Sequence, residues 1–344
     1  MAELIKLRIR EIKTETADSK SYILETLDGL PLLYKAGQFL TLLLEHQGRE
    51  VRRSYSLSST PGIDPFPVVT IKRVTNGEIS RWILNTWQVG DVIDSLAPAG
   101  RFVLPSEGSN DLFLFAAGSG ITPVFSLLKS LLREQPKRRI LLFYSNTNLA
   151  GTIFKAELDQ LVHQYSNHLT IEYIWSNPPE PFPHRRLNNM LVERLVFQYY
   201  QPDHGIPDFY LCGPEDYMRM VRIVLLFLGF PAEAIRKENF VIDVTPPAIP
   251  EGFGVDAEVE IQYHGKRHKI HVEAGMYILT AALRAGISLP FSCRGGRCST
   301  CVAHCVKGKV KMTINDVLTE REMAEGEMLT CTALAETDKV IIQL

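Results

Sequence analysis

The sequence predicts a multidomain protein with an antiparallel β-barrel, an α/β domain built on a parallel sheet, and a small C-terminal β domain. Three observations support this prediction. Short alternating strands fill the chain up to about residue 105, apolar strands then alternate with amphipathic helices, and a proline-rich stretch precedes a final cysteine-rich segment. A chain of 344 residues can hold two or three domains, each with its own core. We expect domains at 1–105, 106–242 and 253–344, with a linker at 243–252.

Composition and charge argue against several classes of function. A net charge of −2 provides no basic field, so a nucleic-acid partner is not expected. The most apolar run, Ile223–Phe230, is too short to cross a bilayer, and the first residues do not follow the pattern of a secretory signal. Four of the six cysteines belong to one motif, which favours a reducing compartment over a disulfide framework. We therefore expect a cytoplasmic protein without a membrane partner.

The first domain is expected to be rich in β-strands. Its alternating runs are separated by Gly, Pro and Asp turns, as in a barrel or a sandwich. These runs are Leu4–Ile12, Ser21–Glu25, Phe39–Leu44, Val68–Val74 and Asp91–Ala97.

A strand with an unusual combination of side chains lies at 52–59. Arg53, Tyr55 and Ser56 offer a cation, a ring and a hydroxyl, which could hold a pyrophosphate, a flat heterocycle and its polar edge. The same residue types also occur on ordinary surface strands, so both interpretations stay open. Farther on, Ser80 follows a turn at Gly77 near the start of a helix. A serine hydroxyl there either binds phosphate or caps the helix.

The second domain begins with a strand that is apolar on both faces, Leu112–Ala117. A glycine turn, Gly118–Pro123, follows it and leads into a helix with leucines at helical spacing. We expect Thr122 to cap this helix and Pro123 to take its first position. A strand, a glycine turn and a helix N-terminus together suit a dinucleotide pyrophosphate. Pro123 replaces the third glycine of G-x-G-x-x-G, so the common dehydrogenase fingerprint is not present.

Three more strands are expected at Arg139–Tyr144, Leu169–Trp175 and Asp208–Cys212. Asp208–Cys212 is expected to be the last strand of the parallel sheet. The third one ends in Cys212-Gly213-Pro214 before another helix. Because ligands bind at the carboxyl ends of parallel strands, Cys212 and Gly118 should face one crevice. Cys212 could equally be a small buried residue at the end of a strand.

The C-terminal segment contains four cysteines in a specific spacing. Cys293, Cys298 and Cys301 form C-x4-C-x2-C, and Cys331 follows after residues 302–330. This is the plant-type spacing for a [2Fe-2S] cluster, in which one loop supplies three thiolates and a distant segment the fourth. The alternatives are buried structural thiols or a zinc site.

A zinc site would use Cys298 and Cys301 together with His304 or Cys305. Such sites usually pair two short motifs, and Cys331 has no close partner in the sequence. No C-x-H element that would indicate a Rieske centre precedes the loop. Cys305 is expected to be a spare buried thiol.

In combination, the motifs Arg53–Ser56, Gly77-x-x-Ser80, Gly118–Pro123 and Cys212–Pro214 resemble the ferredoxin–NADP reductase superfamily. With the C-terminal cysteine loop, the whole chain resembles the one-chain reductase components of oxygenases, above all the reductases of phenylacetyl-CoA epoxidases. The resemblance implies a flavin-binding β-barrel, a nicotinamide-binding α/β domain and a β-grasp ferredoxin domain. It also implies transfer of electrons from NAD(P)H through FAD and a [2Fe-2S] cluster to a partner oxygenase. Such chemistry belongs to the cofactors and requires no acid–base catalytic residue.

The resemblance assigns roles residue by residue. It implies that the flavin contacts Arg53, Tyr55, Ser56, Lys72, Val74, Gly77 and Ser80. It implies that the nicotinamide nucleotide contacts Gly118, Gly120, Thr122, Cys212 and Gly213, and that the cluster is held by Cys293, Cys298, Cys301 and Cys331. Glu238 and Phe240 resemble the closing acid–aromatic pair, in which Phe240 covers the flavin, although Phe240 could also be a core aromatic. The segment Gly77–Ser80 favours FAD over FMN.

The sequence departs from the resemblance at one position. Where the phenylacetyl-CoA relatives have an arginine suited to the 2′-phosphate of NADPH, this chain has Thr147. Loss of a charged hydrogen bond there would cost roughly 1.5–3 kcal/mol, so a preference for NADPH is in doubt. Other functions stay open as well: reduction of a different redox protein such as a ferredoxin or flavodoxin, or a redox sensor without turnover. Arg294 and Arg297 flank the cysteines and could dock an acidic partner or be solvated loop charges.

Overall fold

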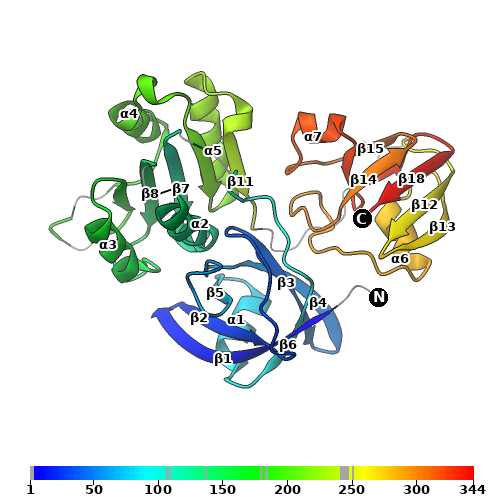
Figure 1. The fold of residues 1–344 in the computed structure, drawn as a ribbon, viewed down its shortest axis with the longest axis horizontal. Coiled ribbons are helices and arrows are strands. Elements are labelled where there is room, and N and C mark those ends of the chain that lie inside the picture. Colours follow the sequence, from blue (N-terminus) through cyan, green and yellow to red (C-terminus); the bar gives the residue numbers. More distant parts are fainter. Residues whose placement is uncertain are drawn as a thin grey trace.

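The computed structural model describes residues 4–105, 108, 110–135, 138–178, 180–182, 185–240, 248–249 and 252–344. Most of the expected linker, 243–252, lies outside the described residues. Three larger sheets mark three lobes, with the N-terminal lobe in blue to cyan, the second in green and the C-terminal lobe in yellow to red (Figure 1).

The N-terminal sheet is antiparallel and closes into a barrel. Its strands are β1 (Ile5–Thr16), β2 (Ser19–Thr26), β3 (Phe39–His46), β4 (Arg49–Ser56), β5 (Val68–Lys72) and β6 (Val92–Ser95). They pair in the order β4-β3-β6-β1-β2-β5, and a bridge between Leu57 and Val69 joins the end of β4 to β5. This closure removes open edges that could pair with another chain. Of the two architectures expected for this domain, the barrel is therefore the correct one.

The barrel interior is filled from alternate positions of its strands. Leu7 and Ile9 of β1 and Leu40 and Leu42 of β3 are fully buried. Helix α1 (Glu78–Thr86) adds Ile83 to the same core. The alternation in the sequence thus reflects side chains that point inward and outward in turn.

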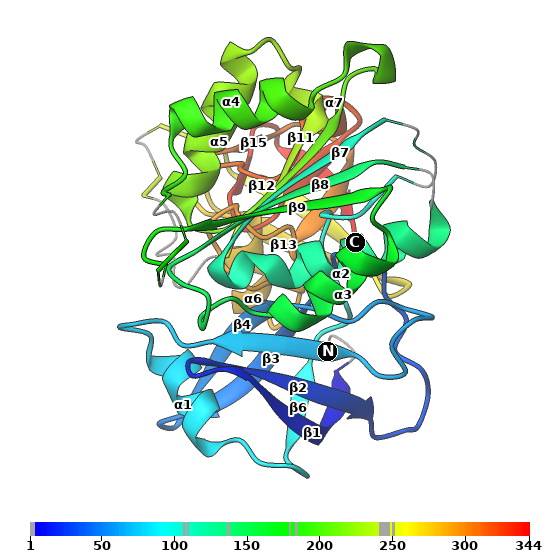
Figure 2. The same ribbon diagram turned by 90° about the vertical axis from the view of Figure 1, so that its left-hand side faces the viewer.

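The second sheet is entirely parallel and has helices on both faces. Its strands are β7 (Leu112–Ala117), β8 (Ile140–Asn146), β9 (Leu169–Trp175), β10 (Asp208–Cys212) and β11 (Ile235–Glu238), in the order β11-β10-β7-β8-β9. Helices α2 (Ile121–Glu134) and α3 (Lys155–Gln164) cover the face toward the barrel, and α4 (Asn189–Tyr199) and α5 (Glu215–Phe227) cover the other (Figure 2). Short 3-10 helices are η1 (Gly118–Gly120), η2 (Pro202–His204) and η3 (Ala232–Ala234).

Two local predictions for this domain are wrong. The strand β10 is not the last, because β11 pairs beside it. The sequence of β11, Ile-Arg-Lys-Glu, has one apolar residue and no alternation, so it carries no strand signal. Thr122 does not cap α2, because the helix begins at Ile121 directly after η1, and Thr122 instead donates a hydrogen bond to the Ser119 carbonyl oxygen at 3.0 Å. Pro123 accordingly lies at the third helical position.

The C-terminal sheet is mixed. Its strands are β12 (Ala257–Tyr263), β13 (Lys266–Val272), β14 (Val302–Lys307), β16 (Glu327–Leu329) and β18 (Lys339–Gln343), in the order β13-β12-β18-β14-β16. Strands β12 and β18 are parallel and the other pairs antiparallel. Helix α6 (Ile278–Arg284) packs on this sheet, β15 (Val310–Met312) pairs with β17 (Ala333–Ala335), and α7 (Glu320–Ala324) is short. This is the expected β-grasp arrangement. Among the helices that the structure describes, none has both the length and the apolar character needed to span a bilayer.

Candidate functional site

The four cysteines of the motif lie together as two pairs. The Cys293 backbone N–H donates toward Cys298 Sγ at 3.5 Å, and the side chains of Cys301 and Cys331 are hydrogen-bonded to each other. A hydrogen bond with Cys298 lowers the pKa of the Cys293 thiol to about 6, and hydrogen bonding to Cys331 together with burial raises the pKa of Cys301. Two adjacent thiol pairs fit a cluster of two irons, each of which takes two protein sulfurs.

Cys298 and Cys301, which the alternative zinc site would share, belong to different thiol pairs, Cys298 with Cys293 and Cys301 with Cys331. In the described part of the chain, no three His, Cys, Asp or Glu side chains are grouped to hold one metal ion. The Cys305 thiol lies in β14 and donates to the Lys307 carbonyl oxygen at 3.5 Å. Cys305 thus lies apart from the four cysteines, as expected for a spare thiol, but it is half-buried rather than buried.

The cysteine loop depends on close backbone approaches. Gly296 has φ of +72°, and a Cβ there would lie 2.5 Å from the Ile314 carbonyl oxygen. The Gly295 N–H donates to Cys293 Sγ at 3.4 Å. The loop thus places a backbone donor on sulfur, which stabilises thiolate charge.

The strand β4 carries Arg53, Tyr55 and Ser56 along the barrel. Burial raises the pKa of the Tyr55 hydroxyl. The Ser56 Oγ is buried and has no hydrogen-bond partner among the described residues. Because a buried hydroxyl without a partner is costly, Ser56 fits a site whose bound group supplies that partner. The residues present therefore fit a flavin that uses this strand.

The segment that follows β5 wraps tightly. Ser80 is the third residue of α1, so it is not the N-cap, which is Gly77. Its Oγ instead accepts a hydrogen bond from the Val74 N–H at 3.1 Å. A Cβ on Gly77 would lie 2.7 Å from Val74 Cβ and 2.8 Å from Ser80 Oγ. The close backbone approach at the start of α1 thus requires glycine. Lys72, at the end of β5, forms an ion pair with Asp18, with its Nζ 3.6 Å from Asp18 Oδ2.

The two glycine turns of the parallel sheet are in direct contact. A Cβ on Gly120 would lie 2.1 Å from the Cys212 carbonyl oxygen, and one on Gly213 would lie 2.9 Å from Ala117 Cβ. Gly118 has φ of +54°, and the position of its missing Cβ is 4.0 Å from Lys72 Nζ of the barrel. The sheet therefore brings together the residues expected at one crevice and places them next to the barrel.

Glu238 and Cys212 are partners in the β10–β11 register, at the carboxyl end of both strands. Burial raises the pKa of the Glu238 carboxyl to about 8, and burial, assisted by the charge of Glu238, raises the pKa of the Cys212 thiol. Phe240 is 39% exposed, so the interpretation of this residue as a core aromatic is wrong. It lines a cavity of about 250 Å³ that also borders Gly213 and Arg297.

The raised pKa of Glu238 predicts a pH-dependent stability. The folded protein holds the carboxyl proton up to about pH 8, whereas the ordinary value is 4.5. The contribution of the Glu238 carboxyl to the free energy of unfolding is therefore fully present below pH 4.5 and is lost as the pH rises toward 8. We expect Glu238→Gln to flatten the fall in melting temperature across this window. The exposed Glu233→Gln is the control, and an unchanged pH profile in Glu238→Gln would contradict the prediction.

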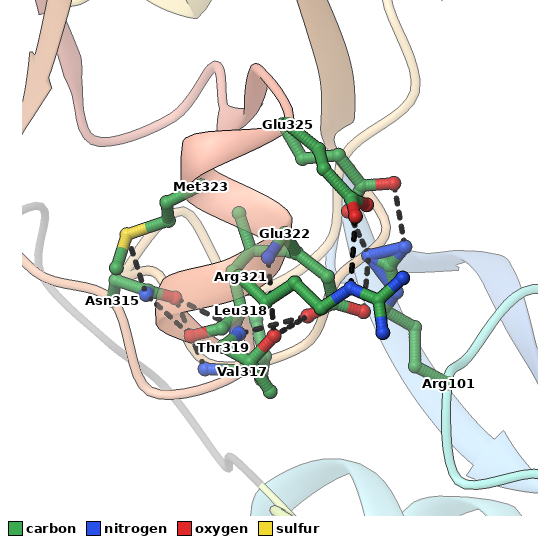
Figure 3. A network of polar contacts seen from close by, with 10 residues as sticks. Arg101, Asn315, Val317, Leu318, Thr319, Arg321, Glu322, Met323 and Glu325 are labelled. Carbon is green, nitrogen blue, oxygen red and sulfur yellow. Dashed lines mark hydrogen bonds and ion pairs between the residues drawn. The ribbon is translucent and has the colours of Figure 1, made fainter. Parts of the chain in front are cut away.

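The cysteine loop lies against β4 of the barrel. Ser292 Oγ is 2.9 Å from Ser54 Oγ, and the Arg52 guanidinium lies over the Phe291 ring at 3.8 Å. Figure 3 shows a second junction, where Arg101 of the barrel domain approaches the C-terminal domain near α7. There Arg101 forms ion pairs with Glu322, at 3.4 Å, and with Glu327. The sites of the first and third domains are thus neighbours.

The cysteine loop also contacts the parallel-sheet domain. Arg297 pairs with Glu215 at 3.3 Å, at the start of α5, and with Asp316 at 3.2 Å. The Arg297 guanidinium is therefore neutralised by carboxylates of its own chain, which argues against the hypothesis that it docks an acidic partner. Arg294 is exposed and lies over the Phe291 ring at 4.3 Å.

Sequence reasoning missed the residues of these junctions, namely Arg52, Ser54, Arg101, Phe291 and Ser292. No local pattern marks them, since each contact joins residues more than 200 positions apart. Only the position of Phe291 and Ser292 directly before a cysteine ligand motif could have drawn attention to them.

The fold and this site define a class of protein, a modular reductase with flavin, nicotinamide and iron–sulfur modules. Three family models match the chain: an oxidoreductase FAD-binding domain at residues 6–104, an oxidoreductase NAD-binding domain at 114–223, and a 2Fe-2S iron-sulfur cluster binding domain at 261–336. The chain is thus an NAD(P)H-dependent oxidoreductase that uses FAD and a [2Fe-2S] cluster.

Curated relatives match nearly the whole chain. The ferredoxin reductase component of 3-ketosteroid-9-alpha-monooxygenase from Rhodococcus rhodochrous is 32% identical over 98% of this chain and 96% of its own length. A component of the 1,2-phenylacetyl-CoA epoxidase from Escherichia coli is 29% identical over 99% of this chain and 98% of its own. The chain belongs to the family of single-chain ferredoxin reductase components of monooxygenases.

Solved structures agree on the fold. Phthalate dioxygenase reductase has a TM-score of 0.60 at 24% identity and covers 99% of this chain and 98% of its own. An intact type IV self-sufficient cytochrome P450 monooxygenase has a TM-score of 0.76 at 21% identity, over 99% of this chain and 41% of its own.

Proposed function

We propose that this protein is an NADH-dependent reductase that passes electrons through FAD and a [2Fe-2S] cluster to a separate oxygenase component. The observation that carries the proposal is the contact between Ser292, beside the cysteine motif, and Ser54 in the strand expected to bind flavin. A reductase that must hand electrons from flavin to cluster needs these two sites side by side.

We infer the following roles for the site residues. Cys293 with Cys298, and Cys301 with Cys331, hold the two irons as two pairs. When bound, the flavin would supply the chemistry that takes a hydride from NADH and releases electrons one at a time to the cluster. On β4, Arg53 would pair with the flavin pyrophosphate and Tyr55 would pack on the flavin ring. The Ser56 hydroxyl, which has no partner among the described residues, would form a hydrogen bond with the polar edge of that ring. Lys72, Val74, Gly77 and Ser80 enclose the ribityl and phosphate portion.

The nicotinamide nucleotide occupies the crevice between the two glycine turns. Gly118, Gly120 and Thr122 present the backbone of η1 and α2 to the dinucleotide, and Cys212 and Gly213 lie beside the nicotinamide ring. Phe240 covers the flavin until the nicotinamide displaces it, which its partial exposure supports.

The division of the chain is part of the proposal. We assign the FAD-binding barrel to 1–105, the nicotinamide domain to 106–242, the linker to 243–252 and the ferredoxin domain to 253–344. Six free cysteines and a cluster that needs reduced thiols support a cytoplasmic location.

The electron acceptor is an oxygenase component. The relatives are named as parts of a 3-ketosteroid monooxygenase, a phenylacetyl-CoA epoxidase and a glycine betaine monooxygenase. The test is a visible spectrum of the purified protein, followed by anaerobic titration with NADH and then addition of candidate oxygenase components. Flavin and iron–sulfur absorption that bleaches with NADH, and substrate turnover that depends on the oxygenase, are expected. A protein that NADH does not reduce would refute the proposal, and one that reduces only a free ferredoxin or flavodoxin would redirect it.

The donor preference is a separate prediction. The Ser145 hydroxyl and the Asn146 amide lie buried at the carboxyl end of β8 without a hydrogen bond of ordinary geometry to described residues, although the Tyr217 and Tyr144 hydroxyls are close to them. These neutral groups, followed by Thr147, suit ribose hydroxyls better than a 2′-phosphate. We expect NADH to be preferred and Thr147→Arg to improve kcat/KM for NADPH by roughly tenfold, in line with a charged hydrogen bond of about 1.5 kcal/mol. Thr147→Gln is the uncharged control, and equal NADPH kinetics in both variants would contradict the prediction.

A further inference from the structure

Phe291 lies two residues before Cys293 and beneath two guanidinium groups. The Cζ atoms of Arg52 and Arg294 are 3.8 Å and 4.3 Å from the centre of its ring. The ring is 8% exposed and the Arg52 side chain 13% exposed. A guanidinium within about 6 Å of a ring is attracted by the ring quadrupole, and more strongly when water is excluded. Because Arg52 belongs to the barrel, this contact joins two domains.

Hydrogen bonds reinforce the same junction. Arg52 Nη1 donates to the Phe291 carbonyl oxygen at 3.4 Å, and its Nε donates to Glu50 at 2.8 Å. The Ser54 Oγ lies 2.9 Å from Ser292 Oγ and also 2.9 Å from Thr41 Oγ1 of the neighbouring strand β3. The contacting side chains of β4 are therefore held from both sides.

The junction shares its strand with the flavin residues. Side chains along a strand point to opposite sides in turn, so Arg52, Ser54 and Ser56 share one side of β4, and Arg53 and Tyr55 lie on the other. The side of β4 that contacts the cysteine loop thus also carries Ser56, one of the residues assigned to the flavin. Any tilt of this loop would change the distance between the two redox sites.

The other two junctions of the C-terminal domain are more open. Arg297 and Glu215 are 32% and 69% exposed in their side chains, and an exposed ion pair contributes little and weakens further with salt. Arg101 is 34% exposed and bonds both carboxylate oxygens of Glu327, so this part-buried pair also holds the two domains together. The contact at Phe291 is more buried than both, and it is the one that adjoins the cysteine motif.

We propose that Arg52, Phe291 and Arg294, together with the Ser54–Ser292 contact, are positioning residues that set the rate of electron transfer from flavin to cluster. The step moves one electron from the reduced flavin to the oxidised cluster, with no bond made or broken between them. This inference rests on the proposed function, which assigns the flavin to β4 and the cluster to the loop of Cys293.

The test is anaerobic stopped-flow reduction of the holoprotein by NADH, with flavin and cluster bands followed separately. Phe291→Leu removes the ring, and Arg52→Gln removes the cation from the other domain. We expect flavin reduction at the parent rate and slower cluster reduction in both variants, because the loop before Cys293 is no longer fixed against β4 by the cation–π contact. Phe66→Leu is the matched control, since its ring lies under Arg10 at 4.5 Å within the barrel, and it should leave both steps unchanged.

The outcomes separate the inference from its basis. Cluster reduction at the parent rate in both variants would overturn the positioning role, and equal slowing of both steps would show a general structural effect instead. If Phe291→Leu lost cluster, Arg52→Gln would decide, because it leaves the cysteine loop unaltered. An unsubstituted protein without a reducible [2Fe-2S] signal would refute the proposed function rather than this inference.

Discussion

Cys298→Ser is expected to abolish the iron–sulfur absorption and the reduction of an acceptor protein, while flavin content and NADH oxidation with a small artificial acceptor stay at parent levels. A [2Fe-2S] cluster needs four thiolates, and Cys298 lies against Cys293, with which it is proposed to hold one of the two irons. Among the described residues, those in the core of the C-terminal domain all come from 257 onward, and those in the barrel core all belong to the first domain. Loss of the cluster should therefore leave the flavin domain folded.

The matched control for this prediction is Cys305→Ser. Its thiol is in β14 and points to the Lys307 and Gly308 carbonyl oxygens, so its removal should preserve both cofactors. Iron and acid-labile sulfide analysis, a visible spectrum and cytochrome c reduction measure the effect. Simultaneous loss of flavin and cluster in Cys298→Ser would show that the domains do not fold independently.

Most of the fold could be predicted because its signals are local. The alternation in β1 and β3, the continuous apolar run of β7 and the hairpin of β12 and β13 each follow from a few adjacent residues. The strand β11 could not be predicted, since its stability comes from pairing with β10 rather than from its own side chains. The same holds for the start of α2, where η1 replaces a side-chain cap.

The candidate site divides in the same way. The cysteine spacing and the glycine turns can be read from the sequence because one loop supplies most of each site. The burial of Ser56 and the closeness of Glu238 to Cys212 depend on how distant strands meet. The contact between the Phe291 ring and the Arg52 guanidinium depends on how the first and third domains dock, and no local sequence pattern predicts that docking.

Gly120→Ala is expected to abolish reduction of the flavin by NADH while flavin binding persists. The new Cβ would lie 2.1 Å from the Cys212 carbonyl oxygen and 2.7 Å from the Gly213 nitrogen. Both neighbours are backbone atoms, so the two turns at the carboxyl ends of β7 and β10 must move apart. Overpacking of this kind costs about 1–3 kcal/mol, and it displaces the two turns that are proposed to hold the nicotinamide nucleotide.

Gly151→Ala provides the control for the added methyl group. Its Cβ would meet only Asn148, at 3.3 Å from a side-chain oxygen that can move, in the same domain. Stopped-flow flavin reduction and NADH binding by fluorescence should be lost in Gly120→Ala and unchanged in Gly151→Ala, with a lower melting temperature only in the former. The barrel and the cysteine loop do not contain Gly120, so chemically reduced flavin should still pass electrons to the cluster. Normal NADH reduction of the Gly120→Ala protein would mean that the two turns separate freely, and that the crevice between them is not the nicotinamide site.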